Sequence, residues 1–326
     1  MRLMLHLANL FLRGTALMLC LVGAATGLGC LGGAFSDQLD ILTHAAPIWL
    51  ACGLAGLALA LACSRDSERR ALVGIGLAGA ISVLIVMTPE LLSTLHGPDK
   101  SAKAVSTLKV VQFNLWAENH DTTATAAWIL KQNADVVIAE EAGSRAWPVL
   151  QALKKTYPYR LPCRIKYGCD TRIYSRWPIA ASHGFYEEKT VLVGGWVTLH
   201  HPDGDFTVVG THFVWPVPAG AWQAQSRALA ASIAPFPKDT LILTGDFNST
   251  PWSWGLRRQD EALGLKRRTR ALASWPSGAF SRVASAPFPI LPIDHVYAGN
   301  TWKTVKVERG PVLGSDHRPV VVTLVR

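Results

Sequence analysis

The chain has 326 residues, 49% of them hydrophobic, with a formal net charge of +9 and a mean hydropathy of +0.21. This composition is too apolar for one soluble domain and excludes a chain of that kind. Residues 1–100 carry equal numbers of acidic and basic side chains, so the whole positive excess lies in residues 101–326. A basic second part favours anionic partners such as phosphates, lipid headgroups or nucleic acid.

Three long apolar stretches lie in the first hundred residues, at 14–35, 45–63 and 71–92. Each approaches the ~20 residues that cross a bilayer and lacks charge over its central part. Their many Gly and Ala residues suit close helix packing in lipid. The alternative is a cleaved signal peptide followed by core helices, but the first stretch exceeds the usual apolar region of a signal peptide and two more follow it. We therefore expect residues 1–95 to form a membrane domain with three transmembrane helices.

The charges between these stretches predict an orientation. Basic side chains lie before the first stretch and between the second and third: Arg2, Arg13, Arg65, Arg69 and Arg70. Asp37 and Asp40 lie between the first and second. Because positive loops stay in the cytoplasm, we expect a multi-pass protein of a bacterial inner membrane with residues after 92 extracytoplasmic.

Six cysteines are present. Four lie in or beside the apolar stretches and are expected to be small packing residues: Cys20, Cys30, Cys52 and Cys63. Cys163 and Cys169 lie in the basic part without a Cys-x-x-Cys spacing, which argues against zinc. Outside the cytoplasm this pair could form a disulfide that closes a short loop.

A cluster of basic residues follows residue 256: Arg257, Arg258, Lys266, Arg267, Arg268 and Arg270. The sequence leaves two interpretations open, an anion-binding surface and a solvated helix face.

Residues 96–107 are small and polar, which suits a linker. From residue 108 onward, short runs rich in Val and Ile alternate with helix-like segments. The runs are 108–113, 136–139, 173–175, 191–199, 206–209, 241–244, 293–297 and 319–324, and the helical candidates are 123–132, 146–155 and 222–233. This alternation predicts sheets covered by helices, an α/β or α+β layered domain over 108–326.

Several of these runs end on polar groups of catalytic type: Asn114, Glu140, Glu141, His212, Asp246, Asn248, Asp294, Asp316 and His317. Taken singly, each could be a turn, a cap or a solvated side chain. Together they place acids, amides and histidines beside strands. Hard oxygen ligands without a cysteine cluster suit Mg²⁺ or Mn²⁺.

The octet 241–248, Leu-Ile-Leu-Thr-Gly-Asp-Phe-Asn, is the most informative of these segments. If the strand continues, Asp246 and Asn248 point the same way and Phe247 turns into the protein. A carboxylate beside a neutral amide can position a water near a phosphate. The alternative is a strand that ends in an Asx turn.

The order of motifs resembles the endonuclease/exonuclease/phosphatase superfamily, the Mg²⁺-dependent fold of DNase I, exonuclease III-type repair nucleases, neutral sphingomyelinases and inositol-polyphosphate 5-phosphatases. The matching segments are Gln-Phe-Asn-Leu, Asp-Val-Val-(x)₃-Glu, Tyr-Ser-Arg-Trp-Pro-Ile, Thr-His-Phe, Gly-Asp-Phe-Asn-Ser-Thr-Pro, Ile-Asp-His-Val and Ser-Asp-His-Arg-Pro. The resemblance implies a four-layer α/β sandwich with two central sheets and a site at one end.

The resemblance also implies the metal side of the site. Glu141 resembles the metal-binding glutamate, Asn114 the asparagine beside the metal, and Asp316 a second metal-side or phosphate-side acid. The residue before the metal glutamate is often Gln in the family but is Glu140 here, which leaves Glu140 as the alternative ligand. A further acid often supports the second site histidine, and Asp170 is near that place.

The remaining roles concern water and phosphate. Asp246 and Asn248 resemble the pair that orients or activates the attacking water. His317 resembles the phosphate-contacting histidine and Asp294 the acid that holds it. His212 resembles the second site histidine, a candidate general acid or transition-state donor.

Three N-terminal spans before such a domain resemble the membrane-anchored bacterial branch of the superfamily, which includes a teicoplanin-resistance membrane protein thought to act on lipid-linked pyrophosphate. We therefore expect a Mg²⁺-dependent hydrolase, with Mn²⁺ possible, that acts on a lipid-linked phosphate ester or pyrophosphate at the outer face of the membrane. Tryptophans near the expected site loops suit a headgroup layer but also suit base stacking: Trp215, Trp222, Trp252, Trp254 and Trp275. The alternatives are an extracytoplasmic nuclease and, less favoured, a non-catalytic binding module.

Overall fold

The computed structural model describes every residue except 96, 98–105, 162–169, 186–190 and 280–283. Most of the expected linker and both Cys163 and Cys169 lie outside the described residues, so the structure does not address their disulfide. The chain divides into two compact units. The first contains Met1–Leu95, Val217–Ala219 and Trp252–Arg257, and the second contains His96–Pro216, Gly220–Pro251 and Arg258–Arg326.

The first unit is built from three long helices, α1 (Arg2–Gly32), α3 (Ala46–Cys63) and α4 (Asp66–Thr94), with a short helix α2 (Asp37–Asp40) and a 3₁₀ turn (Ile41–Ala45) before α3. By length and composition, all three long helices are apolar enough to cross a membrane, as the sequence predicts. They approach each other closely because glycines face glycines. A Cβ atom on Gly27 would lie 2.6 Å from the Gly79 carbonyl oxygen, so only glycine permits this contact.

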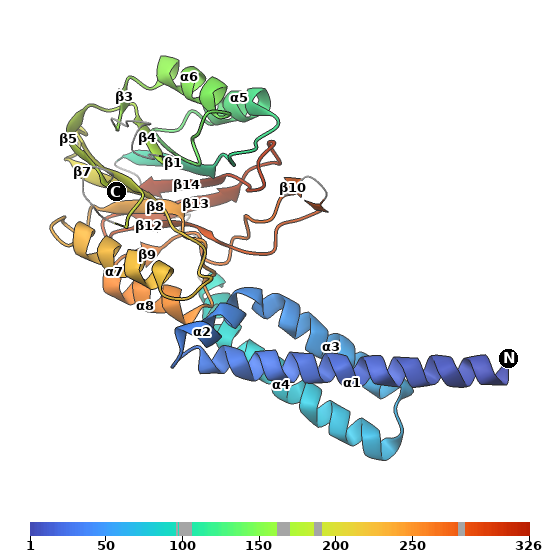
Figure 1. Cartoon of the computed structure of the whole chain (residues 1–326). Helices are drawn as coiled ribbons and strands as arrows, with labels where there is room; N and C mark the ends of the chain where they lie inside the picture. Colours follow the sequence, from blue (N-terminus) through green and yellow to red (C-terminus); the bar gives the residue numbers. More distant parts are fainter. Residues whose placement is uncertain (96, 98–105, 162–169, 186–190, 280–283) are drawn as a thin grey trace. The chain divides into compact units, whose positions relative to one another are not determined.

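The second unit contains two six-stranded mixed sheets (Figure 1). The first has the order β13-β14-β1-β2-β4-β3. Its strands are β1 (Thr107–Asn114), β2 (Val136–Glu140), β3 (Tyr159–Arg160), β4 (Arg172–Ser175), β13 (Lys303–Arg309) and β14 (Val320–Val325). The second has the order β5-β6-β7-β8-β12-β9. Its strands are β5 (Ile179–Gly184), β6 (Gly194–Leu199), β7 (Phe206–His212), β8 (Ile242–Asp246), β9 (Lys266–Arg267) and β12 (Asp294–Ala298). A separate small hairpin joins β10 (Gly278–Ala279) to β11 (Ser285–Ala286).

Helices cover the outer faces of the two sheets (Figure 1). The helices α5 (Thr122–Gln132) and α6 (Trp147–Thr156) lie over the first sheet, while α7 (Ala221–Ile233) and α8 (Trp254–Leu263) lie over the second. One buried core joins the facing sides of the two sheets, and a second joins the first sheet to α5 and α6. The result is the expected α/β sandwich of the DNase I type, with two helical and two sheet layers.

Strand β1 shows why the central strands read as continuous apolar runs. Val110 points into the core between the sheets, and its neighbour Val111 points into the core beneath the helices. Both side chains are fully buried because both faces of the sheet are covered. A strand of this kind lacks the alternation of polar and apolar residues that marks a half-exposed strand.

Two strands at the edges of the sheets were not predicted from the sequence. β5 and β13 lie at sheet edges, and most of their residues are exposed or only half-buried. Neither contains an apolar run, because an edge strand buries too little surface to need one. The central strands and the helices α5, α6 and α7 lie within a few residues of the predicted ranges.

Part of the basic cluster is structural, contrary to both interpretations of it. Arg267 is buried at 4% exposure and its guanidinium lies 3.0 Å from the Asp260 carboxylate. Arg268 donates to the carbonyl oxygens of Ala298, Gly299 and Trp302. Burial lowers the pKa of Arg268 to about 10. These two arginines therefore stabilise strands β9 and β12 and are not part of a free anion-binding surface or a solvated helix face.

Candidate active site

The pairing of the central strands aligns the polar strand ends. In the second sheet, Asp246 at the end of β8 pairs with His212 of β7 on one side and Asp294 of β12 on the other. In the first sheet, Asn114 at the end of β1 pairs with Glu140 at the end of β2. Each sheet therefore presents a row of polar side chains at one end of the sandwich.

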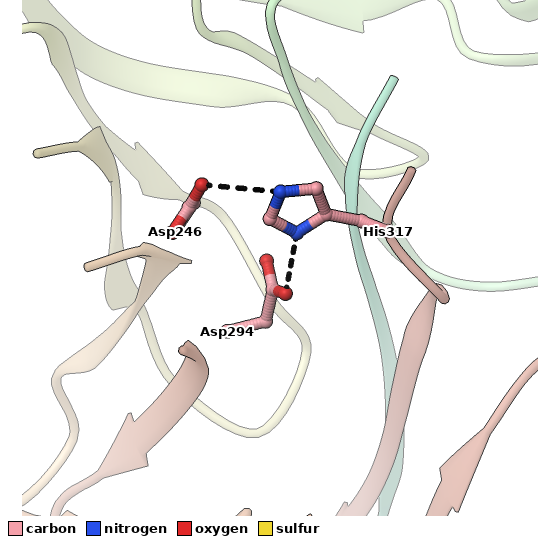
Figure 2. A group of neighbouring side chains, drawn as sticks. All are labelled: Asp246, Asp294 and His317. Carbon is pink, nitrogen blue, oxygen red and sulfur yellow. Dashed lines mark hydrogen bonds and ion pairs between the residues drawn. The ribbon is translucent and has the colours of Figure 1, made fainter. Parts of the chain in front are cut away.

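Asp246 is the centre of the site. Its carboxylate accepts hydrogen bonds from Asn114 Nδ2 at 3.0 Å and from the backbone N–H of Asn248 at 2.8 Å. The Nε2 atom of His317 lies 3.6 Å from its Oδ2 (Figure 2). The Nε2 atom of His212 lies 3.7 Å from the same oxygen. Burial raises the pKa of Asp246 to about 6, although the two nearby imidazoles act in the opposite direction. One carboxylate is thus surrounded by one amide and two imidazoles.

His317 and Asp294 form the first of two imidazole–carboxylate pairs. His317 Nδ1 lies 2.8 Å from Asp294 Oδ2, and both side chains are buried (Figure 2). Burial alone would lower the pKa of His317, but the charges of Asp294 and Asp246 outweigh it and raise this pKa to about 10. Burial alone would likewise raise the pKa of Asp294, which the charge and hydrogen bond of His317 hold below its ordinary value. His317 is therefore an imidazolium at neutral pH.

His212 and Asp170 form the second pair. His212 Nδ1 lies 3.0 Å from Asp170 Oδ2, which agrees with the acid expected near residue 170. Burial alone would lower the pKa of His212, but the hydrogen bond to Asp170 and the charge of Asp246 raise it to about 9. Each ring turns its Nε2 toward Asp246, so the site presents two cationic donors around one carboxylate.

The two neighbouring glutamates have different environments. Glu141 follows the end of β2 with a left-handed backbone (φ 49°), and its carboxylate accepts from Asn114 Nδ2 at 3.0 Å and from the backbone N–H of Ala117 at 2.8 Å. Glu140 is completely buried and accepts from Gln112 Nε2 at 3.1 Å. Burial and the nearby charge of Asp294 raise the pKa of Glu140 well above its ordinary value. The half-buried Glu141 contacts Asn114, so the two residues that the resemblance assigns to the metal side lie together.

Asn248 departs from the expected geometry. The strand ends at Asp246, and Asn248 has a left-handed backbone (φ 48°), so the alternation argument for Asp246 and Asn248 does not apply. Its backbone N–H closes an Asx turn onto Asp246 Oδ1, and its side-chain amide donates to the Phe213 carbonyl oxygen at 2.8 Å. Phe247 is fully buried, as expected. The Asx turn and the polar site therefore occur together at this strand end.

Asp316 lies beside His317 at the rim of the site. Its Oδ2 accepts from the indole Nε1 of Trp275 at 3.1 Å, and its buried Oδ1 accepts no hydrogen bond from any described residue. Burial raises the pKa of Asp316, and the negative charge of Glu141 adds to this effect. The preceding Ser315 donates to the Asn114 carbonyl oxygen at 2.8 Å and accepts from the His317 N–H at 3.0 Å, which holds this segment against β1.

The side chains at this end of the sandwich suit a divalent cation. Asp246, Asp294 and His317 have ligand atoms within 4.8 Å of one another. However, both nitrogens of His317 face carboxylates and its pKa is raised, so the ring is protonated and a poor ligand. Glu141 and Asp316 offer carboxylate oxygens, one of them without a hydrogen bond, and a cation between them would offset their repulsion. Oxygen donors of this kind fit Mg²⁺ or Mn²⁺.

Two residues at the site, Gln112 and Ser315, were given no role from the sequence, and a third, Trp275, was expected only near a site loop. Gln112 donates from one amide nitrogen to Asp294 Oδ1 at 2.7 Å and to Glu140, and it is completely buried. Ser315 and Trp275 contact the site through the hydrogen bonds described above. Gln112 lies two residues before Asn114 on β1. Its position near a strand end that carries polar residues is the signal that could have identified it. For Trp275 the sequence predicted a place near a site loop but not the bond to Asp316, because the two residues meet only through the fold.

Comparisons with known proteins show the family to which the chain belongs. The family model described as the Endonuclease/Exonuclease/phosphatase family matches residues 111–317, and this chain belongs to that family. Members of the family are typically phosphoester hydrolases, some of them metal-dependent. A search of curated protein sequences gave no match.

Solved structures show the same fold at low sequence identity. SmcL is 19% identical over 68% of this chain and 99% of its own, with a TM-score of 0.54. TDP2 of D. rerio, complexed with a single-strand DNA product, is 13% identical over 68% of this chain and 100% of its own, with a TM-score of 0.53. An endonuclease/exonuclease/phosphatase family protein of Bacteroides thetaiotaomicron is 16% identical over 69% of this chain and 99% of its own, with a TM-score of 0.52.

Proposed function

We propose that this chain is a membrane-anchored, divalent-metal-dependent phosphoesterase that hydrolyses a lipid-linked phosphate ester or pyrophosphate at the outer face of the membrane. One observation carries the catalytic part of the proposal. A buried carboxylate, Asp246, lies between two imidazole–carboxylate pairs, with Asn114 and Glu141 beside it. Positive donors around one carboxylate suit an anionic ester attacked by water.

The side chains at the site have separate roles in the proposed reaction. A divalent ion held by Glu141 and Asp316, with Asn114 beside it, would neutralise the phosphate and stabilise the negative charge that develops on it. Asp246 orients the attacking water and is the candidate to accept its proton. His317 and His212 carry protons on nitrogens that face the same space and donate to phosphoryl oxygens or to the leaving oxygen.

The membrane part of the proposal is supported by the three helices that are apolar enough to span a bilayer. With the basic N-terminus and the basic loop between α3 and α4 in the cytoplasm, the chain after α4 would lie outside. A water-soluble substrate would not need such an anchor, so we favour a substrate that resides in the membrane. The positive excess of residues 101–326 also suits nucleic acid, which makes an extracytoplasmic nuclease the second candidate.

Hydrolysis by the full chain in detergent micelles tests the catalytic proposal. The substrates are a prenyl pyrophosphate, a sphingomyelin-like lipid and plasmid DNA, each with Mg²⁺, with Mn²⁺ and with chelator. The variant Asp246→Asn should lower kcat by about 100-fold or more, because a group that orients or deprotonates water contributes on this scale. Asp205→Asn is the matched control, because Asp205 is half-exposed and lies just before β7, at the opposite end of this strand from His212.

The outcomes separate the candidates. Metal-dependent turnover of a lipid that is lost in Asp246→Asn and retained in Asp205→Asn supports the proposal. Rapid nicking of DNA without lipid turnover would favour the nuclease. If no ester is hydrolysed with either metal, the fold serves here as a binding module.

A further inference from the structure

We propose that Trp215 and Trp275 form an apolar subsite beside the candidate active site and select esters that carry a long aliphatic chain. The inference rests on the proposed phosphoesterase function and adds a determinant of its substrate class. It comes from two tryptophans in contact with each other, one of which is bonded to Asp316, and from exposed apolar side chains near them.

Trp275 is held against the reacting side of the site. Its indole Nε1 donates to Asp316 Oδ2 at 3.1 Å, and the backbone N–H of Ser277 donates to the Asp316 carbonyl oxygen at 2.8 Å. Asp316 precedes His317, whose Nε2 faces Asp246. A molecule that touches this indole therefore lies close to the groups that would hold the phosphate.

Trp215 contacts Trp275 and comes from the segment that follows His212. It lies three residues after His212, on the segment that follows β7, and half of its surface is exposed (50%). The two indoles meet edge to face, with ring centroids 5.4 Å apart and planes inclined by 75°. The pair thus joins the segment after His212 to the segment that contacts Asp316.

The surface beside this pair is apolar. Val214 is 43% exposed and Ile290 is 37% exposed, and the backbone N–H of Ile290 donates to the Trp275 carbonyl oxygen at 3.0 Å. Leaving an indole and two aliphatic side chains in water costs free energy in proportion to their area. Exposed apolar side chains near a site are typical of a surface that binds an apolar group.

The ring geometry excludes a nucleobase that is sandwiched between the two indoles. The rings are too inclined and too close for a planar base to insert between them. A flexible chain can instead lie along the edge of one ring and the face of the other. The three apolar helices of the same chain would keep the enzyme where substrates with such chains reside.

Two diesters with the same leaving group test the subsite. The full chain in lipid nanodiscs hydrolyses dodecyl p-nitrophenyl phosphate or methyl p-nitrophenyl phosphate with Mg²⁺, and KM and kcat are measured for each. The ratio of the two KM values is the chain-length preference. Because every variant is assayed in the same bilayer, partitioning of the dodecyl chain cancels between variants.

Trp215→Ala should reduce the chain-length preference about tenfold through the KM of the dodecyl ester, because a truncated indole removes apolar contact area. Trp215→Phe should retain most of the preference. Trp147→Ala is the matched control, because Trp147 is equally exposed (49%) but lies on α6, where it contacts Lys154.

An unchanged chain-length preference in Trp215→Ala would overturn the subsite. A Trp215→Ala variant that loses only the nicking of DNA would also overturn it. If neither diester is hydrolysed, the proposed function fails and binding of dodecylphosphonate decides the inference. Binding that weakens in Trp215→Ala but not in Trp147→Ala supports it, and equal binding overturns it.

Discussion

His317 Nδ1 lies 2.8 Å from Asp294 Oδ2 in the buried interior of the site. Asp294 begins β12 of the second sheet, whereas His317 lies three residues before β14 of the first. The pair therefore forms only because the two sheets face each other at this end of the sandwich. It fixes the orientation of the ring and keeps it protonated.

Asp294→Asn should lower kcat by about 100-fold or more, on the scale of a lost acid–base contribution. The amide keeps the size of the side chain but removes the charge that raises the pKa of His317 to about 10. The pKa of His317 then falls and a smaller fraction of rings carries the proton at neutral pH. Steady-state kinetics against a lipid phosphoester measure the effect. Wild-type kcat in this variant would contradict the role of the pair.

Asp170→Asn should move the alkaline limb of the kcat/KM profile to lower pH by about one unit or more. His212 has the lower of the two raised imidazole pKa values, about 9 against about 10 for His317, so it loses its proton first as the pH rises. Removing the Asp170 charge lowers the pKa of His212. A pH profile of the variant beside that of Asp205→Asn measures the shift. An unmoved limb would exclude His212 as the titrating donor.

Glu141→Gln should raise the Mg²⁺ concentration needed for half-maximal activity by about 10-fold or more, because the variant loses a charged oxygen ligand. Glu140→Gln should change it much less. Glu140 is completely buried and bonded to Gln112, and its raised pKa favours the neutral acid that glutamine resembles. Activity titrations with Mg²⁺ and Mn²⁺ compare the two variants. A larger effect at Glu140 would make it the ligand instead.

His295 should make the fold acid-sensitive. It is completely buried, with Nε2 lying 2.8 Å from the Ser249 carbonyl oxygen, and burial lowers its pKa to about 3. As the pH falls below 6.5, the unfolded chain binds this proton and the folded chain does not. The stabilising contribution is therefore complete above pH 6.5 and is lost progressively down to pH 3.

From this group alone, the free energy of unfolding should drop by about 2 kcal/mol between pH 7 and pH 5. His295→Gln should retain a donor toward Ser249 and lose this dependence. Thermal unfolding of the full chain in detergent at both pH values, followed by tryptophan fluorescence, measures it. An equal loss in variant and wild type would assign the acid sensitivity to other groups.

A reporter fused after Arg326 should behave as extracytoplasmic, because the basic N-terminus and the arginines at the start of α4 (Arg65, Arg69 and Arg70) are held in the cytoplasm. An alkaline phosphatase fusion, active only outside, and a green fluorescent protein fusion, fluorescent only inside, give opposite signals. Activity confined to the cytoplasmic reporter would reverse the orientation and exclude a site at the outer face.

Local pattern was sufficient for the central strands and for most of the site. Asn114, His212 and Asp246 each end a strand whose apolar run is visible in the sequence, and the strands end together because their registers align. The edge strands β5 and β13 were missed because a strand that buries little surface carries little apolar signal. The prediction that the Asp246 and Asn248 side chains point the same way was wrong, because the strand ends at Asp246.

The sequence by itself determined the three apolar helices, the layered α/β class and the polar residues at the strand ends. These follow from periodicity and run length, which are properties of neighbouring residues. Only the tertiary structure decided the partners: Asp170 with His212, Gln112 with Asp294, and Trp275 with Asp316. Their members are 41 to 182 residues apart in the chain. Contacts at such separations depend on how two sheets pack over a shared core, and no local pattern records that packing.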